Sequence, residues 1–80
     1  KPEVIEDLEQ IIGGSGAAVH TRLRLPADAS EEQIKAAANE ALLRWQRRAE
    51  NPLTPHELAI ASRVAVRTCE GILADLARLR

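Results

Sequence analysis

The sequence predicts a small all-α protein, a helical bundle that contains an antiparallel helix hairpin. Two segments begin with residues that cap helices and continue with apolar residues at helical spacing. The hydrophobic content is 45%, but Trp45 is the only aromatic residue. We therefore expect a core of Leu, Ile, Val and Ala, which suits closely packed helices better than a sheet. A chain of 80 residues makes at most one domain.

The first expected element is an amphipathic acidic helix over residues 2–12. Four of the twelve acidic residues of the chain lie in this segment, toward the helix end where the dipole favours negative charge. A helix of about three turns is not stable alone in water, so its apolar stripe is expected to dock on another surface. The stripe consists of Val4, Ile5, Leu8, Ile11 and Ile12.

Residues 13–16, Gly-Gly-Ser-Gly, interrupt the helical pattern. Two interpretations remain open: a native helix ending followed by a loop, or an engineered linker that joins a partner peptide to a domain. Either interpretation divides the chain in the same way. Residues 1–12 form the acidic helix (a partner peptide or a first helix), residues 13–16 a flexible linker, and residues 17–80 a helical domain.

Residues 17–25 carry an ambiguous pattern. Apolar and β-branched residues alternate as in a strand, but Val19 and Leu23 also have the i, i+4 spacing of a helix. Because no other segment offers a partner strand, we expect a helix. Pro26 is expected to end it, since the residue before a proline is disfavoured in the helical region.

Two segments with the same starting pattern are expected to form the hairpin. Residues 30–33 (Ser-Glu-Glu-Gln) make a capping box and begin a helix over 31–49. Residues 54–57 (Thr-Pro-His-Glu) repeat this pattern with a proline at the first helical position, and begin a helix over 55–78. The short connection between the two helices favours an antiparallel arrangement.

Residues 23–37 read Leu-Arg-Leu-Pro-Ala-Asp-Ala-Ser-Glu-Glu-Gln-Ile-Lys-Ala-Ala, residues 42–45 Leu-Leu-Arg-Trp, and residues 50–52 Glu-Asn-Pro. This stretch resembles the first half of a J-domain. The resemblance implies a short first helix, an antiparallel hairpin of the second and third helices, and a small core.

The sequence departs from the J-domain pattern directly after Trp45. J-domains have His-Pro-Asp there, which engages the DnaK-type chaperone and stimulates its ATPase. This chain has Gln46-Arg47-Arg48, and His-Pro-Asp occurs nowhere in it. The resemblance therefore extends to the fold and not to the co-chaperone activity.

The composition argues against several classes of function. His20 and His56 lie in different segments and Cys69 is the only cysteine, so no metal site, cofactor or catalytic centre is expected. The net charge of −1 and the single aromatic residue make a nucleic-acid partner unlikely, and nothing predicts a small-molecule substrate. Without an apolar run long enough for a membrane span, a cytoplasmic location is expected.

These features predict a non-catalytic protein–protein interaction module, in which an apolar groove with a basic rim binds an amphipathic acidic helix. The last helix has an apolar arc wide enough for two neighbours, and Leu43 forms a separate apolar spot on the outer side of the preceding helix. The alternative is a regulatory or structural appendage of a larger protein, with residues 2–12 as its own first helix. The predicted partner-binding residues are Val4, Ile5, Leu8, Ile11, Ile12, Leu42, Leu43, Arg44, Arg47, Arg48, Val64, Ile72 and Leu76.

Overall fold

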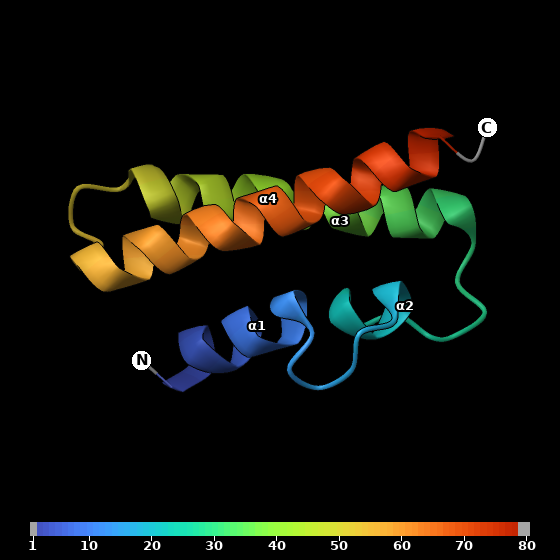
Figure 1. Cartoon of the computed structure of the whole chain (residues 1–80), viewed down its shortest axis with the longest axis horizontal. Helices are drawn as coiled ribbons and strands as arrows, with labels where there is room; N and C mark the ends of the chain where they lie inside the picture. The colour runs from blue at the N-terminus through green and yellow to red at the C-terminus, as the bar shows by residue number, and fades with distance from the viewer. Residues whose placement is uncertain (1, 79–80) are drawn as a thin grey trace.

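The structure is a computed structural model that describes residues 2–78. Over this range it contains four α-helices and no strand: α1 (Pro2–Ile12), α2 (Val19–Arg22), α3 (Glu31–Glu50) and α4 (His56–Arg78) (Figure 1). The all-α class predicted from the sequence is confirmed. The predicted domain limits at residues 1 and 80 lie outside the described residues.

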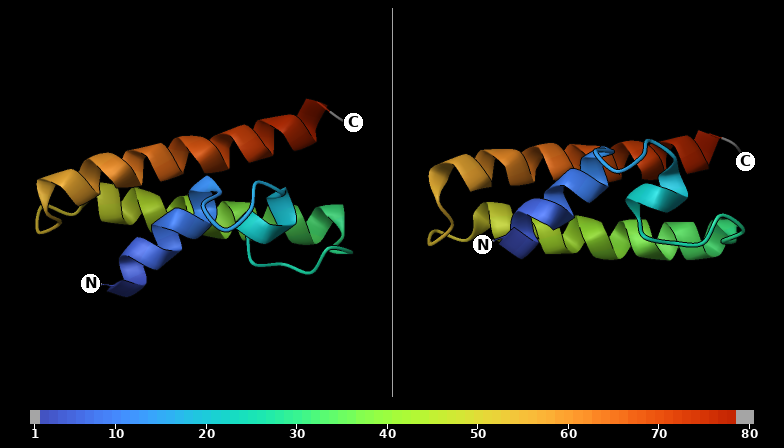
Figure 2. Two further views of the ribbon diagram at one scale, coloured as in Figure 1. Left: turned by 60° about the horizontal axis from the view of Figure 1, so that its bottom comes forward. Right: turned by 90° about the horizontal axis from the view of Figure 1, so that it is seen from below.

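Helices α3 and α4 form an antiparallel hairpin and lie side by side along nearly their whole length (Figures 1 and 2). The predicted capping box begins α3. The backbone N–H of Gln33 donates to Ser30 Oγ (3.1 Å), and the N–H of Ser30 donates to Gln33 Oε1 (2.8 Å). Two donors of the first turn of α3 are thus satisfied by local sequence alone.

The start of α4 differs from the prediction. The helix begins at His56, and the carbonyl of Pro55 accepts its first hydrogen bond, from Ala59 N (2.9 Å). Pro55 therefore occupies the N-cap position in place of Thr54. The hydroxyl of Thr54 donates instead to the carbonyl oxygen of Arg48 (2.8 Å), so it ties the loop to the last turn of α3.

Helix α1 crosses the hairpin and ends at a left-handed glycine (Figure 2). Gly13 has φ +101°. Its N–H donates to the carbonyl oxygen of Gln10 (3.3 Å), and the N–H of Gly14 donates to the carbonyl oxygen of Glu9 (2.7 Å). This pair of bonds is a Schellman motif, in which glycine adopts the left-handed conformation without a Cβ penalty. One of the two sequence interpretations of residues 13–16 predicts such a helix ending.

The helix predicted over 17–25 is shorter than expected, because α2 spans only Val19–Arg22. A second Schellman motif ends it: the N–H of Leu25 donates to the carbonyl of His20 (2.7 Å), and that of Arg24 to the carbonyl of Thr21 (3.1 Å). Arg24 takes the left-handed position with φ +59°, which the sequence pattern did not indicate. Such a conformation strains a residue that carries a Cβ.

The core lies where α1 meets the hairpin. Its centre is Trp45, which is completely buried and packs against residues of α1, α3 and α4. Ser62 is also buried, and its hydroxyl donates to the carbonyl of Leu58 one turn earlier (2.7 Å). The core cluster consists of Ile11, Ala41, Trp45, Ala65 and Cys69.

Candidate functional site

The candidate site is the surface of the hairpin beneath α1, which we call the hairpin groove. Its floor is formed by Ala41 and Trp45 of α3 and by Ala65 and Cys69 of α4. Small side chains at three of these four positions let a third helix approach closely. Ile11 of α1 is only 3% exposed and belongs to the same core cluster. An amphipathic helix of this chain therefore occupies the groove.

Three of the five residues in the predicted stripe of α1 face the hairpin. Ile11 is buried, and Val4 and Leu8 are partly buried against the core. The prediction was wrong for Ile5 and Ile12, which are 55% and 48% exposed. The helical period explains this difference: Ile12 lies about 100° around the helix from Ile11, and Ile5, seven residues earlier, shares the flank of Ile12.

The residues predicted to form the walls of the groove do not all lie beside α1. Ile72 is buried, and Leu42 is partly buried against the core. Leu43 and Val64 are 58% and 52% exposed, so neither forms a wall for α1, which corrects the prediction. Leu43 lies on the outer side of α3, as its sequence position indicated. Leu76 is half-buried and lines a separate hollow toward the C-terminal end of α4.

The predicted basic rim does not pair with α1. Within residues 2–78, none of Arg44, Arg47 and Arg48 takes part in an ion pair. The guanidinium of Arg48 lies over the ring of Trp45, 4.8 Å from its centroid. The ion pair of α1 is made instead by an arginine that was not among the predicted residues. Arg24 Nη2 contacts Asp7 Oδ1 of α1 at 3.0 Å.

Two further hydrogen bonds join α1 to the segment around α2. Arg22 Nε donates to the carbonyl oxygen of Ile11 (3.1 Å), and Gln10 Nε2 donates to that of Thr21 (2.6 Å). The carbonyls at the end of a helix lack intrahelical partners and carry partial negative charge, so a guanidinium there is favourable. No periodic pattern marks Arg22 or Gln10, and sequence reasoning therefore missed them.

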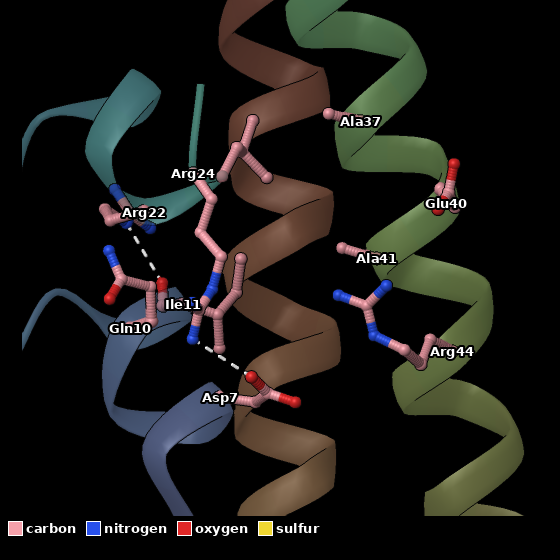
Figure 3. A pocket seen from close by; sticks show the side chains of 10 residues that line it. Asp7, Gln10, Ile11, Arg22, Arg24, Ala37, Glu40, Ala41 and Arg44 are labelled. Atoms are coloured by element: carbon pink, nitrogen blue, oxygen red, sulfur yellow. Dashed lines mark hydrogen bonds and ion pairs between the residues drawn. The ribbon is translucent and has the colours of Figure 1, made fainter. Parts of the chain in front are cut away.

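A cavity of about 200 Å³ lies beside these contacts, between α1, the α2 segment and α3 (Figure 3). The guanidinium of Arg44 points into it from α3, across from Arg24. Glu40 and Asp7 contribute negative charge, so the cavity lining carries side chains of both signs. The cavity is lined by Asp7, Gln10, Ile11, Arg22, Leu23, Arg24, Ala37, Glu40, Ala41 and Arg44.

The core also buries a thiol and two polar nitrogen atoms. Burial raises the pKa of the Cys69 thiol, and the nearby charges of Arg44 and Arg22 oppose this effect only in part. A protonated thiol is a poor nucleophile. Trp45 Nε1 and Arg48 Nη1 are buried and have no hydrogen-bond partner in the described part of the chain.

No group of three or more His, Cys, Asp or Glu side chains is arranged to hold a metal ion within residues 2–78. None of the helices described there has both the length and the apolar character of a membrane span.

The chain is similar to the isoniazid-induced protein IniC in two strains of Mycobacterium tuberculosis, with 40% identity over 76 residues in each. The similarity covers 95% of this chain, but the chain spans only about 15% of the length of IniC. No protein family and no solved structure matches the chain. Nearly all of the chain thus resembles a segment of a longer mycobacterial protein.

Proposed function

We propose that this chain is a non-catalytic protein–protein interaction module whose hairpin groove holds an amphipathic acidic helix. The observation that carries the proposal is the burial of Ile11 among groove residues of both α3 and α4. Within this chain α1 takes the part of the bound helix. A partner protein would present a similar helix with apolar residues at the positions of Val4, Leu8 and Ile11.

Apolar burial supplies most of the affinity in this proposal. Truncation of a fully buried Ile or Leu to Ala typically costs about 2–5 kcal/mol. The ion pair between Asp7 and Arg24 is largely exposed, and such pairs contribute about 0.2–1 kcal/mol. Charge therefore sets the orientation of the bound helix, and the apolar residues set how tightly it is held.

The second candidate is a regulatory or structural appendage of a larger protein, with α1 as its own first helix. Two observations favour it. Hydrogen bonds from Arg22 and Gln10 fasten α1 to the neighbouring segment. The similarity to IniC also extends over 95% of the chain, which supports residues 2–78 as one native unit and residues 13–16 as a native turn.

We further infer that the hairpin is a J-domain-like scaffold that binds a partner but lacks co-chaperone activity. The antiparallel arrangement of α3 and α4 and the capping box at Ser30 support this inference. Residues 46–48 continue α3 as helix, where a J-domain has its His-Pro-Asp loop, so no co-chaperone activity is proposed. A single cysteine kept as a buried free thiol fits a reducing compartment and supports a cytoplasmic location.

An exchange experiment separates the two candidates. A fluorescently labelled peptide of residues 1–12 is titrated into the full chain and followed by fluorescence anisotropy. If the groove exchanges helices, the peptide binds saturably, and unlabelled peptide competes. Leu8→Ala in the peptide should weaken binding at least tenfold, whereas Glu6→Ala should change it little, because Leu8 packs against the core and Glu6 is exposed.

Two outcomes would decide against the interaction module. A peptide that does not bind the full chain, even when the chain carries Ile11→Ala to loosen its own α1, would show that the groove does not accept a helix in trans. If deletion of residues 1–12 then also unfolds the chain, α1 is a permanent part of the fold. That combination would support the structural appendage.

A further inference from the structure

The outward face of α4 carries a strip of residues that no other helix in the described part of the chain covers. They follow one another at alternating intervals of four and three residues, so they share one side of the helix. Ile60 and Val64 are exposed apolar residues within the strip, in a helix that otherwise buries its apolar arc. The outer strip consists of Ile60, Val64, Arg67, Gly71, Ala74 and Arg78, all of them exposed.

The neighbours of α4 lie on its other sides. Val66 and Glu70 line a groove shared with Gln46 of α3, so this flank of α4 faces α3. Helical periodicity places Val64 about 160° around the axis from Val66. Val64 therefore points away from α3, whereas Arg67 of the strip also lines this groove beside α3.

Gly71 lies in the middle of the strip and of α4. Glycine weakens a helix interior, so its presence there calls for a physical reason. A Cβ at Gly71 would meet no atom within 4 Å, which means that nothing among residues 2–78 requires a glycine at this position. The absence of a side chain lets the backbone of another helix approach closely.

The charges around Gly71 select the orientation of that second helix. Arg67 lies four residues before Gly71 and Asp75 four residues after it. In an antiparallel pair of identical helices that cross at Gly71, Arg67 of each copy faces Asp75 of the other. A parallel pair would place Arg67 opposite Arg67 and Asp75 opposite Asp75, and like charges repel. Asp75 also pairs with Arg78 of its own helix, and its second oxygen can accept the new contact.

We propose that α4 packs antiparallel against α4 of a second copy of this chain, with the two helices crossing at Gly71. The crossing buries Val64 of each copy against the other helix and forms two symmetric Arg67–Asp75 contacts. An interface with a two-fold axis uses the same strip on both copies, and it closes after two chains. The proposal does not depend on the hairpin groove, which lies on another side of α4.

Charge reversal in two separate chains tests the proposal directly. Sedimentation velocity of the full chain should show a concentration-dependent dimer. Arg67→Asp and Asp75→Arg should each weaken self-association at least tenfold, because each places like charges opposite one another twice. A one-to-one mixture of the two variants should associate again, because every reversed charge then faces an opposite one.

A substitution at Gly71 provides the matched control for folding. Gly71→Gln adds a good helix former at an open position, so the melting temperature of the dilute chain should not fall. Self-association of the same variant should weaken at least tenfold, because the new side chain blocks the close approach. A purely structural role for Gly71 cannot produce these two effects together.

Three results would overturn the proposal. The first is a wild-type chain that stays monomeric at millimolar concentration, which would mean that any cover of the strip belongs to another protein. The second is a dimer that Gly71→Gln and Arg67→Asp leave unchanged, because another face then forms the contact. The third is a failure of the mixed charge-reversal variants to associate.

Discussion

The α3–α4 hairpin and the N-terminal arm, residues 2–25, reach their structures by different routes. The hairpin helices have 20 and 23 residues, and a local capping box marks where α3 begins. The arm contains helices of 11 and 4 residues, each ended by a residue in the left-handed conformation. Its position depends on one buried isoleucine and on hydrogen bonds that no local pattern encodes. Short helices are marginal alone, so the arm owes its order to the surface that it covers.

The comparison implies an order of stability within the molecule. The hairpin contributes most of the core cluster, whereas the arm contributes only Ile11 as a fully buried residue. Local opening of the arm should therefore require less free energy than unfolding of the hairpin. The following predictions test this order, beginning with the largest expected effect.

Trp45→Ala should destabilise both regions together. Trp45 is completely buried at the centre of the core, and truncation of such a side chain typically costs about 3–5 kcal/mol. That amount is comparable with the whole stability of many small domains, so we expect loss of helical circular dichroism at 37 °C. The control is Leu43→Ala, two residues earlier on the exposed side of α3, which should change the free energy of unfolding by less than about 0.5 kcal/mol. Equal effects of the two substitutions would show that the core is not where the structure places it.

Ile11→Ala should loosen the arm while leaving the hairpin largely helical. The expected cost is about 2–5 kcal/mol, because a buried isoleucine leaves a cavity. Amide hydrogen exchange should accelerate in α1 much more than in α3 and α4. Ile12→Ala is the matched control, since Ile12 is half exposed, and it should have a small effect when measured on dilute chain. If exchange instead accelerates equally in all helices, the arm and the hairpin unfold as one unit, and the comparison above fails.

The sequence predicted best what local physics determines. The start of α3 follows from Ser30 and Gln33, and the exposure of Leu43 follows from its helical position, as both features depend only on neighbouring residues. The prediction was less accurate where a side chain had a choice of partners. Thr54 satisfies a carbonyl of α3 instead of capping α4, a competition that the sequence pattern does not resolve.

The candidate site was predictable in part. The amphipathic stripe identified Val4, Leu8 and Ile11, but it could not show that Ile5 and Ile12 fall outside the contact, because the width of the groove depends on the tertiary arrangement. The arginines were misassigned for a related reason: charge complementarity indicates that α1 needs cations, but not which of the ten positive charges outside residues 1–12 lies nearest.

The smallest predicted effect concerns Arg24, where the arm uses a strained residue to hold α1. Arg24 has φ +59°, and it pairs with Asp7 across the turn. Arg24→Gly and Arg24→Ala both remove the ion pair, which is largely exposed and contributes about 0.2–1 kcal/mol. Only glycine also relieves the left-handed conformation, which costs a residue with a Cβ about 1–2 kcal/mol. The glycine variant should therefore be more stable than the alanine variant by about 1 kcal/mol, and close to wild type, in urea unfolding. High salt should reduce the difference in stability between wild type and the alanine variant, because salt screens an exposed ion pair. It should leave the difference in stability between the alanine and glycine variants unchanged, because neither variant has the ion pair. An alanine variant as stable as the glycine variant would contradict this account, because it would show that the left-handed conformation at position 24 costs a residue with a Cβ little free energy.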